Sequence, residues 1–159
     1  RYGTVTGVQT CALPISDAGE HSINRLEGSI VIFEESLHVQ RPFDEVVAQV
    51  KAALAEQGFG VLTEIDLQAT FEAKIGKKTD KHLIIGACNP HLASMALEAV
   101  PELGVLLPCN VGVRQAGDDV VVEAMDPGVM SQLVDDPEVA AVAGQARTLI
   151  ANAMRKLAD

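Results

Sequence analysis

The chain alternates between stretches with hydrophobic residues at every second position and stretches with them at every third or fourth position. The first kind predicts β-strands, because successive side chains of a strand point to opposite faces of a sheet. These predicted strands are Ile30–Val39, Val61–Asp66, His82–Cys88, Val105–Arg114 and Val120–Met125. The third strand is apolar on both faces, which is typical of a central strand. The last two are expected to form a hairpin that turns at residues 115–119.

The second kind of stretch predicts helices, because residues three and four positions apart share one helical face. The expected helices begin at Pro42 and at Pro90, and further helices cover Leu67–Ile75 and Pro137–Leu157. Asp and Asn are good N-caps and glycine commonly ends a helix. The sequence therefore predicts caps and stops at four positions: Asp66, Asn89, Gly58 and Gly76.

One α+β domain follows from this order of elements. The expected core is β-α-β-β-β-β-α with short inserted helices, in which a single curved, mainly antiparallel sheet is backed by helices. Helices on one face leave the other face of the sheet uncovered, and Leu62 and Leu106 are expected there. An exposed apolar face usually contacts a partner, so the pattern predicts a homodimer.

Composition narrows the class of protein. Hydrophobic residues make up 48% of the 159 residues and charged residues 21%, which is typical of a globular domain. The net charge of −10 disfavours nucleic acids and anionic membranes, because their phosphates would be repelled. No apolar run approaches the ~20 residues that a membrane-spanning helix needs.

Residues 1–29 are expected to lie outside the folded domain. Residues 5–15 look like the translation of a common sequencing-library adapter, so residues 1–16 are expected to be an artefact; the alternative is a natural leader rich in Thr and Gly. Residues 17–29 are polar and without period, which indicates a flexible lead-in, and residues 30–159 form the predicted domain. The true N-terminus is then missing. The missing segment could have carried an export signal. The small number of cysteines favours a reducing compartment and therefore a cytoplasmic location.

Four ordered motifs carry a resemblance to a known family. They are Gly58–Asp66, Ile85–Pro90, Leu106–Val111 and Ala124–Pro127. Together they resemble the bacterial domain-of-unknown-function 302 family over nearly all of residues 30–159. The resemblance implies a TATA-box-binding-protein-like α/β fold with one curved antiparallel sheet, and it implies no activity. Gly112 departs from the pattern, because a branched strand residue is expected there, and it suggests a bulge or a close approach.

Cys88 and Cys109 are the first candidates for a site. Cys88 lies where a strand meets a helix N-terminus, a position that lowers the pKa of a thiol and favours a reactive thiolate. If the two strands are neighbours, the thiols would form a redox pair or bind a soft metal. The alternative is simple packing, since free cysteines are often buried as small hydrophobic residues. Cys109 in particular shares its parity with apolar strand positions.

Asn89, Asn110, Glu64 and Asp66 complete the candidate ligand-binding residues. Capping explains Asn89, whereas an amide at Asn110 inside an apolar strand requires polar partners or a site role. The carboxylates of Glu64 and Asp66 would share one strand face roughly 7 Å apart, as in acid–base or hard-cation sites. Capping by Asp66 and simple exposure are the alternatives. His82 shares the parity of Cys88 and is a weaker candidate ligand.

These residues favour a non-catalytic, soluble domain that binds a small ligand or serves as an accessory dimer. No catalytic residue and no cofactor is predicted. The alternative function is a thiol-dependent one, in which Cys88 and Cys109 carry redox chemistry or bind a soft metal. A purely structural interaction module is the third class, and it requires neither an accessible thiol nor a pocket.

Overall fold

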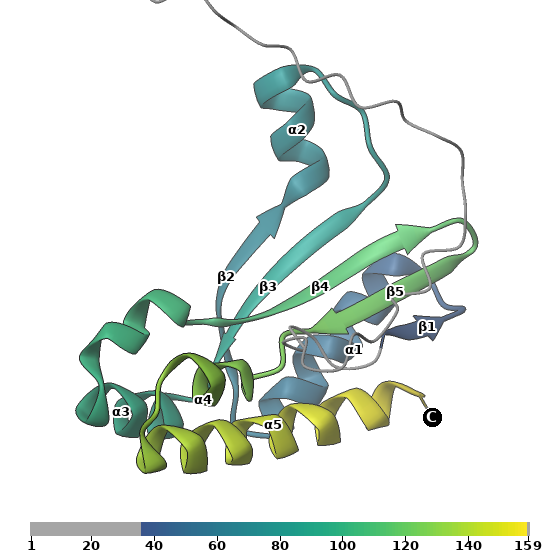
Figure 1. The fold of residues 1–159 in the computed structure, drawn as a ribbon. Helices are drawn as coiled ribbons and strands as arrows, with labels where there is room; N and C mark the ends of the chain where they lie inside the picture. Colours follow the sequence, from purple (N-terminus) through teal and green to yellow (C-terminus); the bar gives the residue numbers. More distant parts are fainter. Residues whose placement is uncertain (1–35, 159) are drawn as a thin grey trace, which may run out of the picture.

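A computed structural model describes residues 36–158 of the chain (Figure 1). The predicted adapter segment 1–16 and lead-in 17–29 lie outside the described residues, as do residues 30–35 of the first predicted strand.

Five strands form one sheet in the order β1-β5-β4-β3-β2, and every neighbouring pair is antiparallel. The predicted α+β class and single antiparallel sheet are therefore confirmed. The strands are β1 (Leu37–Val39), β2 (Gly60–Asp66), β3 (His82–Cys88), β4 (Cys109–Ala116) and β5 (Asp119–Ala124). The helical elements are α1 (Phe43–Glu56), α2 (Leu67–Ile75), α3 (Pro90–Ala99), η1 (Pro101–Leu106), α4 (Val129–Leu133) and α5 (Pro137–Ala158).

The core lies between one face of the sheet and the helices α1 and α5 (Figure 1). Val46, Val50 and Leu54 form the buried stripe of α1 at helical spacing, and each is at most 1% exposed. They meet the alternating valines of β4 and β5 and the buried side of α5. Burying each such side chain favours folding by about 1.5–3 kcal/mol. This layer fixes which face of every strand points inward.

The predicted helix caps are present. The Asp66 carboxylate accepts the Ala69 N–H at 2.9 Å, and the Asn89 side chain accepts the Leu92 N–H at 3.3 Å. Gly76 ends α2 with a φ of 66°, a left-handed conformation that glycine adopts without steric cost. Pro42, expected at the first helical position, is instead the N-cap of α1. The helix therefore begins one residue later than predicted.

The predicted strand Val105–Arg114 is wrong at its start. Pro101–Leu106 is a 3₁₀ helix, and β4 begins only at Cys109. Leu103 is 2% exposed and Leu106 packs against the same core three residues later. A 3₁₀ turn places residues i and i+3 on one side, so this segment buries its leucines by coiling. Leu106 consequently does not lie on the uncovered face of the sheet.

A β-bulge in β2 corrects the predicted strand faces. Val61 pairs with Ala87 and Thr63 pairs with Gly86, so Leu62 is the extra residue. The bulge puts Val61 on the helix-facing side with Glu64, and not with Thr63 and Ile65 as strict alternation predicted.

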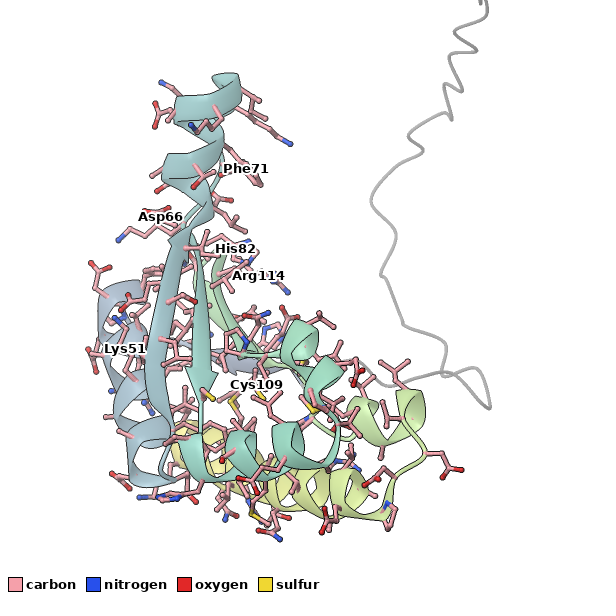
Figure 2. The ribbon with its side chains drawn as sticks, turned by 90° about the vertical axis from the view of Figure 1, so that its left-hand side faces the viewer. Lys51, Asp66, Phe71, His82, Cys109 and Arg114 are labelled. Carbon is pink, nitrogen blue, oxygen red and sulfur yellow. The ribbon has the colours of Figure 1, made fainter. Side chains whose placement is uncertain are left out.

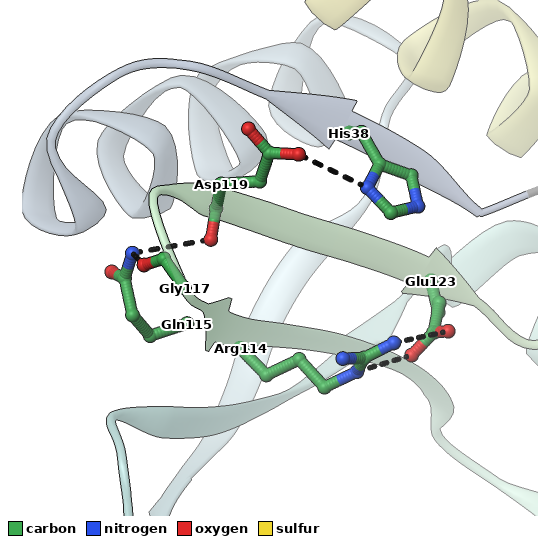
Figure 3. A network of polar contacts seen from close by, with 6 residues as sticks. All are labelled: His38, Arg114, Gln115, Gly117, Asp119 and Glu123. Carbon is green, nitrogen blue, oxygen red and sulfur yellow. Dashed lines mark hydrogen bonds and ion pairs between the residues drawn. The ribbon is translucent and has the colours of Figure 1, made fainter. Parts of the chain in front are cut away.

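Polar side chains lie on the sheet face opposite α1 and α5. The Arg114 guanidinium donates to both carboxylate oxygens of Glu123 at 3.2 Å, and the Ser36 hydroxyl donates to Glu123 at 2.9 Å. At the β4–β5 turn, the Gln115 amide donates to the backbone oxygens of Gly117 and Asp119. Figure 3 shows the contacts of Arg114 and Gln115, together with His38 Nδ1, which lies 3.5 Å from the Asp119 carboxylate. These contacts tie β1, β4 and β5 together outside the core.

A substitution at Gly86 tests how closely β2 and the Pro108 ring pack against β3. A Cβ at Gly86 would collide with Thr63 Oγ1 and would stand 2.7 Å from Cγ of the rigid Pro108 ring. We expect Gly86→Ala to lower the free energy of unfolding by about 1–3 kcal/mol, as other overpacked positions do. Gly144→Ala in α5 is the matched control, since nothing lies within 4 Å of a Cβ there. The control should raise stability by about 0.5–1 kcal/mol in the same urea titration. Equal effects of the two changes would contradict this packing.

Candidate functional site

A small cavity lies at the end of the sheet where β3 and β4 meet α3, α4 and α5. Its volume is about 30 Å³, and both Cys88 and Cys109 line it together with Asn89 and Met130. We call this cavity the thiol pocket. Its remaining wall is almost entirely apolar and includes Phe59, Leu92, Ala96, Leu107, Val142 and Ala146.

Strand register brings the two cysteines to the same end of the sheet. Ala87 pairs with Cys109, so Cys88 is one residue beyond the last pair between β3 and β4. At Asn89 the chain leaves the sheet and caps α3, which places Cys88 at a strand-to-helix junction as predicted. Figure 2 shows sulfur atoms gathered around Cys109, between the end of the sheet and the helices.

Burial governs the chemistry of both thiols. It raises the pKa of Cys88 above its ordinary value, and it raises the pKa of Cys109 to about 11, with the nearby charge of Cys88 as the second cause. Both thiols stay protonated near neutral pH, so the predicted lowering of the Cys88 pKa by a helix N-terminus is wrong. Desolvation is the stronger effect at this position.

The two asparagines have separate environments. Asn89 lines the thiol pocket. A Cβ added at Gly58 would stand 3.1 Å from its Nδ2, so the N-cap of α3 packs against the turn that follows α1. Asn110 is exposed. Because the register pairs it with Gly86, it faces away from the core, and water can satisfy its amide. The expectation of a buried amide in need of protein partners is wrong.

Glu64 and Asp66 have separate structural partners. Glu64 is 2.7 Å from the Lys51 ammonium of α1, whereas Asp66 caps α2. Both residues are exposed on β2. In Figure 2, Asp66 lies near the base of α2, well away from Cys109. Each carboxylate thus has its own structural partner, and neither contributes to the thiol pocket.

His82 lies at the far end of β3 from Cys88. It pairs with Arg114 of the neighbouring strand β4 and lies beside that residue in Figure 2. The pKa of Glu123 is lowered, first by its hydrogen bond from Arg114 and, as a smaller effect, by the charge of His82. His82 therefore belongs to the polar face of the sheet, and the two thiols lie outside its reach.

The sequence reasoning missed Met130 and Asp126. Met130 is 5% exposed and adds a thioether to the thiol pocket. Asp126 is 2% exposed, accepts the Gly128 N–H at 2.8 Å and lies 3.3 Å from the Arg147 guanidinium. This ion pair fixes the start of α4 against α5 and so positions Met130. The sequence signal was the Asp126-Pro127 pair, which predicts a turn but not what the turn contacts.

Within residues 36–158, no group of three or more His, Cys, Asp or Glu side chains is arranged to hold a metal ion. Any metal in the thiol pocket would therefore depend on the two cysteines and on the thioether of Met130. In the same part of the chain, no helix combines the length and the apolar character that crossing a membrane requires.

The family model for the domain of unknown function DUF302 matches residues 35–157. The chain belongs to the DUF302 family. The crystal structure of an uncharacterized conserved DUF302 protein from Bacillus stearothermophilus has the same fold, with a TM-score of 0.71 and 21% sequence identity. The match covers 77% of this chain and 95% of that one. No curated protein matches the sequence. The DUF302 membership implied by the four motifs is therefore confirmed, and so is the expected α+β class with one antiparallel sheet.

The raised pKa of Cys109 predicts a pH-dependent stability. The unfolded thiol titrates near 9.0 and the folded thiol near 11. Because the folded pKa is the higher one, this contribution is complete below about pH 9 and is lost as the pH rises through about 11. We expect the difference in unfolding free energy between the natural chain and Cys109→Ala to shrink above about pH 9, by at most ~1.4 kcal/mol per pH unit.

Urea unfolding of both chains at about pH 8 and at about pH 10.5 measures this difference directly. A difference that is the same at the two pH values would contradict a buried, protonated Cys109.

Proposed function

We propose that this DUF302 domain is a non-catalytic binding domain whose ligand is one soft metal ion, held between the sulfur atoms of Cys88 and Cys109. The observation that carries the proposal is that both thiols line a single small cavity. The register supports it, because Cys88 directly follows Ala87, the residue that pairs with Cys109. The proposal retains a homodimer as the working unit, because large apolar side chains are exposed on β2 and α2.

The size of the thiol pocket favours an ion over an organic molecule. Pockets for drug-sized ligands are roughly 300–1,000 Å³, whereas this cavity is about 30 Å³. A single water molecule needs roughly 10–15 Å³ on the same kind of measure. The mainly apolar wall offers a water few hydrogen-bond partners. An ion with affinity for sulfur fits both the volume and the wall.

The ligand atoms favour a soft monovalent ion such as Cu(I). Structural zinc sites are almost always tetrahedral, with four Cys, His or carboxylate ligands, and the described residues offer only two near the thiol pocket. Thiolate and thioether sulfur are the ligands that Cu(I) prefers, and low coordination numbers suit it. Cys88, Cys109 and Met130 supply such a set. The surrounding hydrophobic residues would shield the ion from water.

A dithiol redox pair is the second candidate, favoured by the presence of both cysteines in the wall of the thiol pocket. Thiol–disulfide exchange proceeds through the thiolate. Burial raises the pKa of both cysteines, so little thiolate is available near neutral pH. A metal can displace the protons as it binds, whereas exchange with a second thiol also needs access. The buried position of Cys109 therefore favours metal binding.

Copper titration tests the proposal. Cys11, the third cysteine of the 159-residue chain, lies outside the described residues and is replaced by Ser in this test. We expect the Cys11→Ser chain to bind one Cu(I) per chain in anaerobic competition with a Cu(I) chelator. Cys88→Ser or Cys109→Ala should weaken that affinity by ~100-fold, and Met130→Leu by ~10-fold. Met95→Leu is the matched control, since Met95 is 49% exposed and does not line the thiol pocket. Circular dichroism checks that each variant folds.

Two results would overturn the proposal. One is binding that survives in Cys109→Ala. The other is a native chain that binds no Cu(I) yet forms a Cys88–Cys109 disulfide under mild oxidation, which would establish the redox candidate instead.

A further inference from the structure

The segment between α1 and β3 pairs with β3 through β2, but none of the residues of its strand and helix is buried. We call residues 60–81, which contain β2, α2 and the loop to β3, the arm. All seven residues of β2 are exposed, and none of the nine residues of α2 is buried. In Figures 1 and 2 the arm projects away from the layer of helices, with Phe71 far from Cys109. A helix this short is marginal in water without tertiary packing.

The arm nevertheless carries an apolar surface. Leu67, Phe71 and Ile75 lie four residues apart on α2, so they form one stripe along a single helical face. Ile75 is 69% exposed, and Leu62 and Ile65 on β2 are 64% and 46% exposed. Leu67 and Phe71 are half-buried. Several large exposed apolar side chains on one segment usually mark a contact with a partner.

The edge of the sheet at the arm is also open. β2 is an outer strand that pairs only with β3, and it is as long as that interior strand. The opposite outer strand, β1, has only three described residues. Long unpaired edges are usually protected or used for association.

Charge identifies the partner. Lys74, Lys77 and Lys78 are exposed on α2 and in the loop that follows it, in a chain whose net charge is −10. Together with Lys81 they balance the four acidic residues of the arm, whereas the described residues outside the arm carry twelve acidic and six basic side chains. The lysine-bearing end of the arm is therefore complementary in charge to the body of another copy of the same protein. Lys81 is already engaged within the chain, 3.3 Å from the Asp44 carboxylate and above the Phe43 ring.

We infer that the arm is the dimerisation element of this domain. The apolar stripe of α2 packs on the body of a second copy, and the lysines face that copy's acidic surface. A two-fold axis makes the contact reciprocal, so each copy contributes both its arm and its body. A standard interface uses about 20–30 residues on each side, and an arm plus a body surface supplies that number. The inference is independent of the proposed metal ion.

Sedimentation velocity on the full chain tests the inference. We expect a concentration-dependent dimer, and we expect Phe71→Ser with Ile75→Ser to raise its dissociation constant at least tenfold. Neither side chain is buried, so the variant should keep its circular dichroism spectrum. Val105→Ser is the matched control: Val105 is 88% exposed, lies outside the arm, and its change should leave the dissociation constant unaltered.

A second variant separates charge from apolar contact. Lys77→Glu with Lys78→Glu should also weaken the dimer, and added salt should weaken the natural dimer but not this variant. A chain that stays monomeric at the highest attainable concentration would overturn the inference, as would a dimer that the Phe71 and Ile75 changes leave intact. Binding of a polyanion such as heparin by a monomer, lost in the lysine variant, would assign the arm to a different partner. Copper binding is unaffected in each case if the thiol pocket acts as proposed.

Discussion

The pairing of β3 with β4 is the constraint on which the rest of the structure depends. Its register sets Ala87 opposite Cys109 and His82 opposite Arg114, at the two ends of the same pair of strands. One end closes over α3 and α5 and encloses the two thiols in an apolar cavity. The other end lies in the open and carries the charged network around Glu123. The same ladder thus separates an apolar cavity from a charged network.

Local physical chemistry made much of the fold predictable. Capping depends on residues three positions apart, so the roles of Asp66 and Asn89 could be inferred from the sequence and are confirmed by their hydrogen bonds. Alternation and helical spacing likewise placed β3 and α5 with nearly correct limits. Each of these inferences rests on residues that are close together in the sequence.

The predictions from the sequence were wrong where the structure of a segment depends on contacts with residues far away in the chain. The bulge at Leu62 shifts the faces of β2, and only the pairing with β3 reveals it. The 3₁₀ helix before β4 exists because Leu103 is buried in the core formed by other elements. The pKa of Cys88 depends on the neighbours that desolvate it. Met130 reaches the thiol pocket because Asp126 is held by Arg147 on α5, a contact that no spacing in the sequence encodes.

The domain has a packed body, which we propose holds a metal ion, and an arm, which we propose contacts a second copy. The central proposal is that sulfur alone surrounds the ion. Copper K-edge X-ray absorption of the Cys11→Ser chain, loaded with one equivalent of Cu(I), tests that proposal most directly. The account predicts two or three sulfur neighbours near the ~2.3 Å of metal–sulfur bonds, with fewer in Cys109→Ala. A shell dominated by nitrogen or oxygen, or a sulfur shell unchanged in Cys109→Ala, would contradict it.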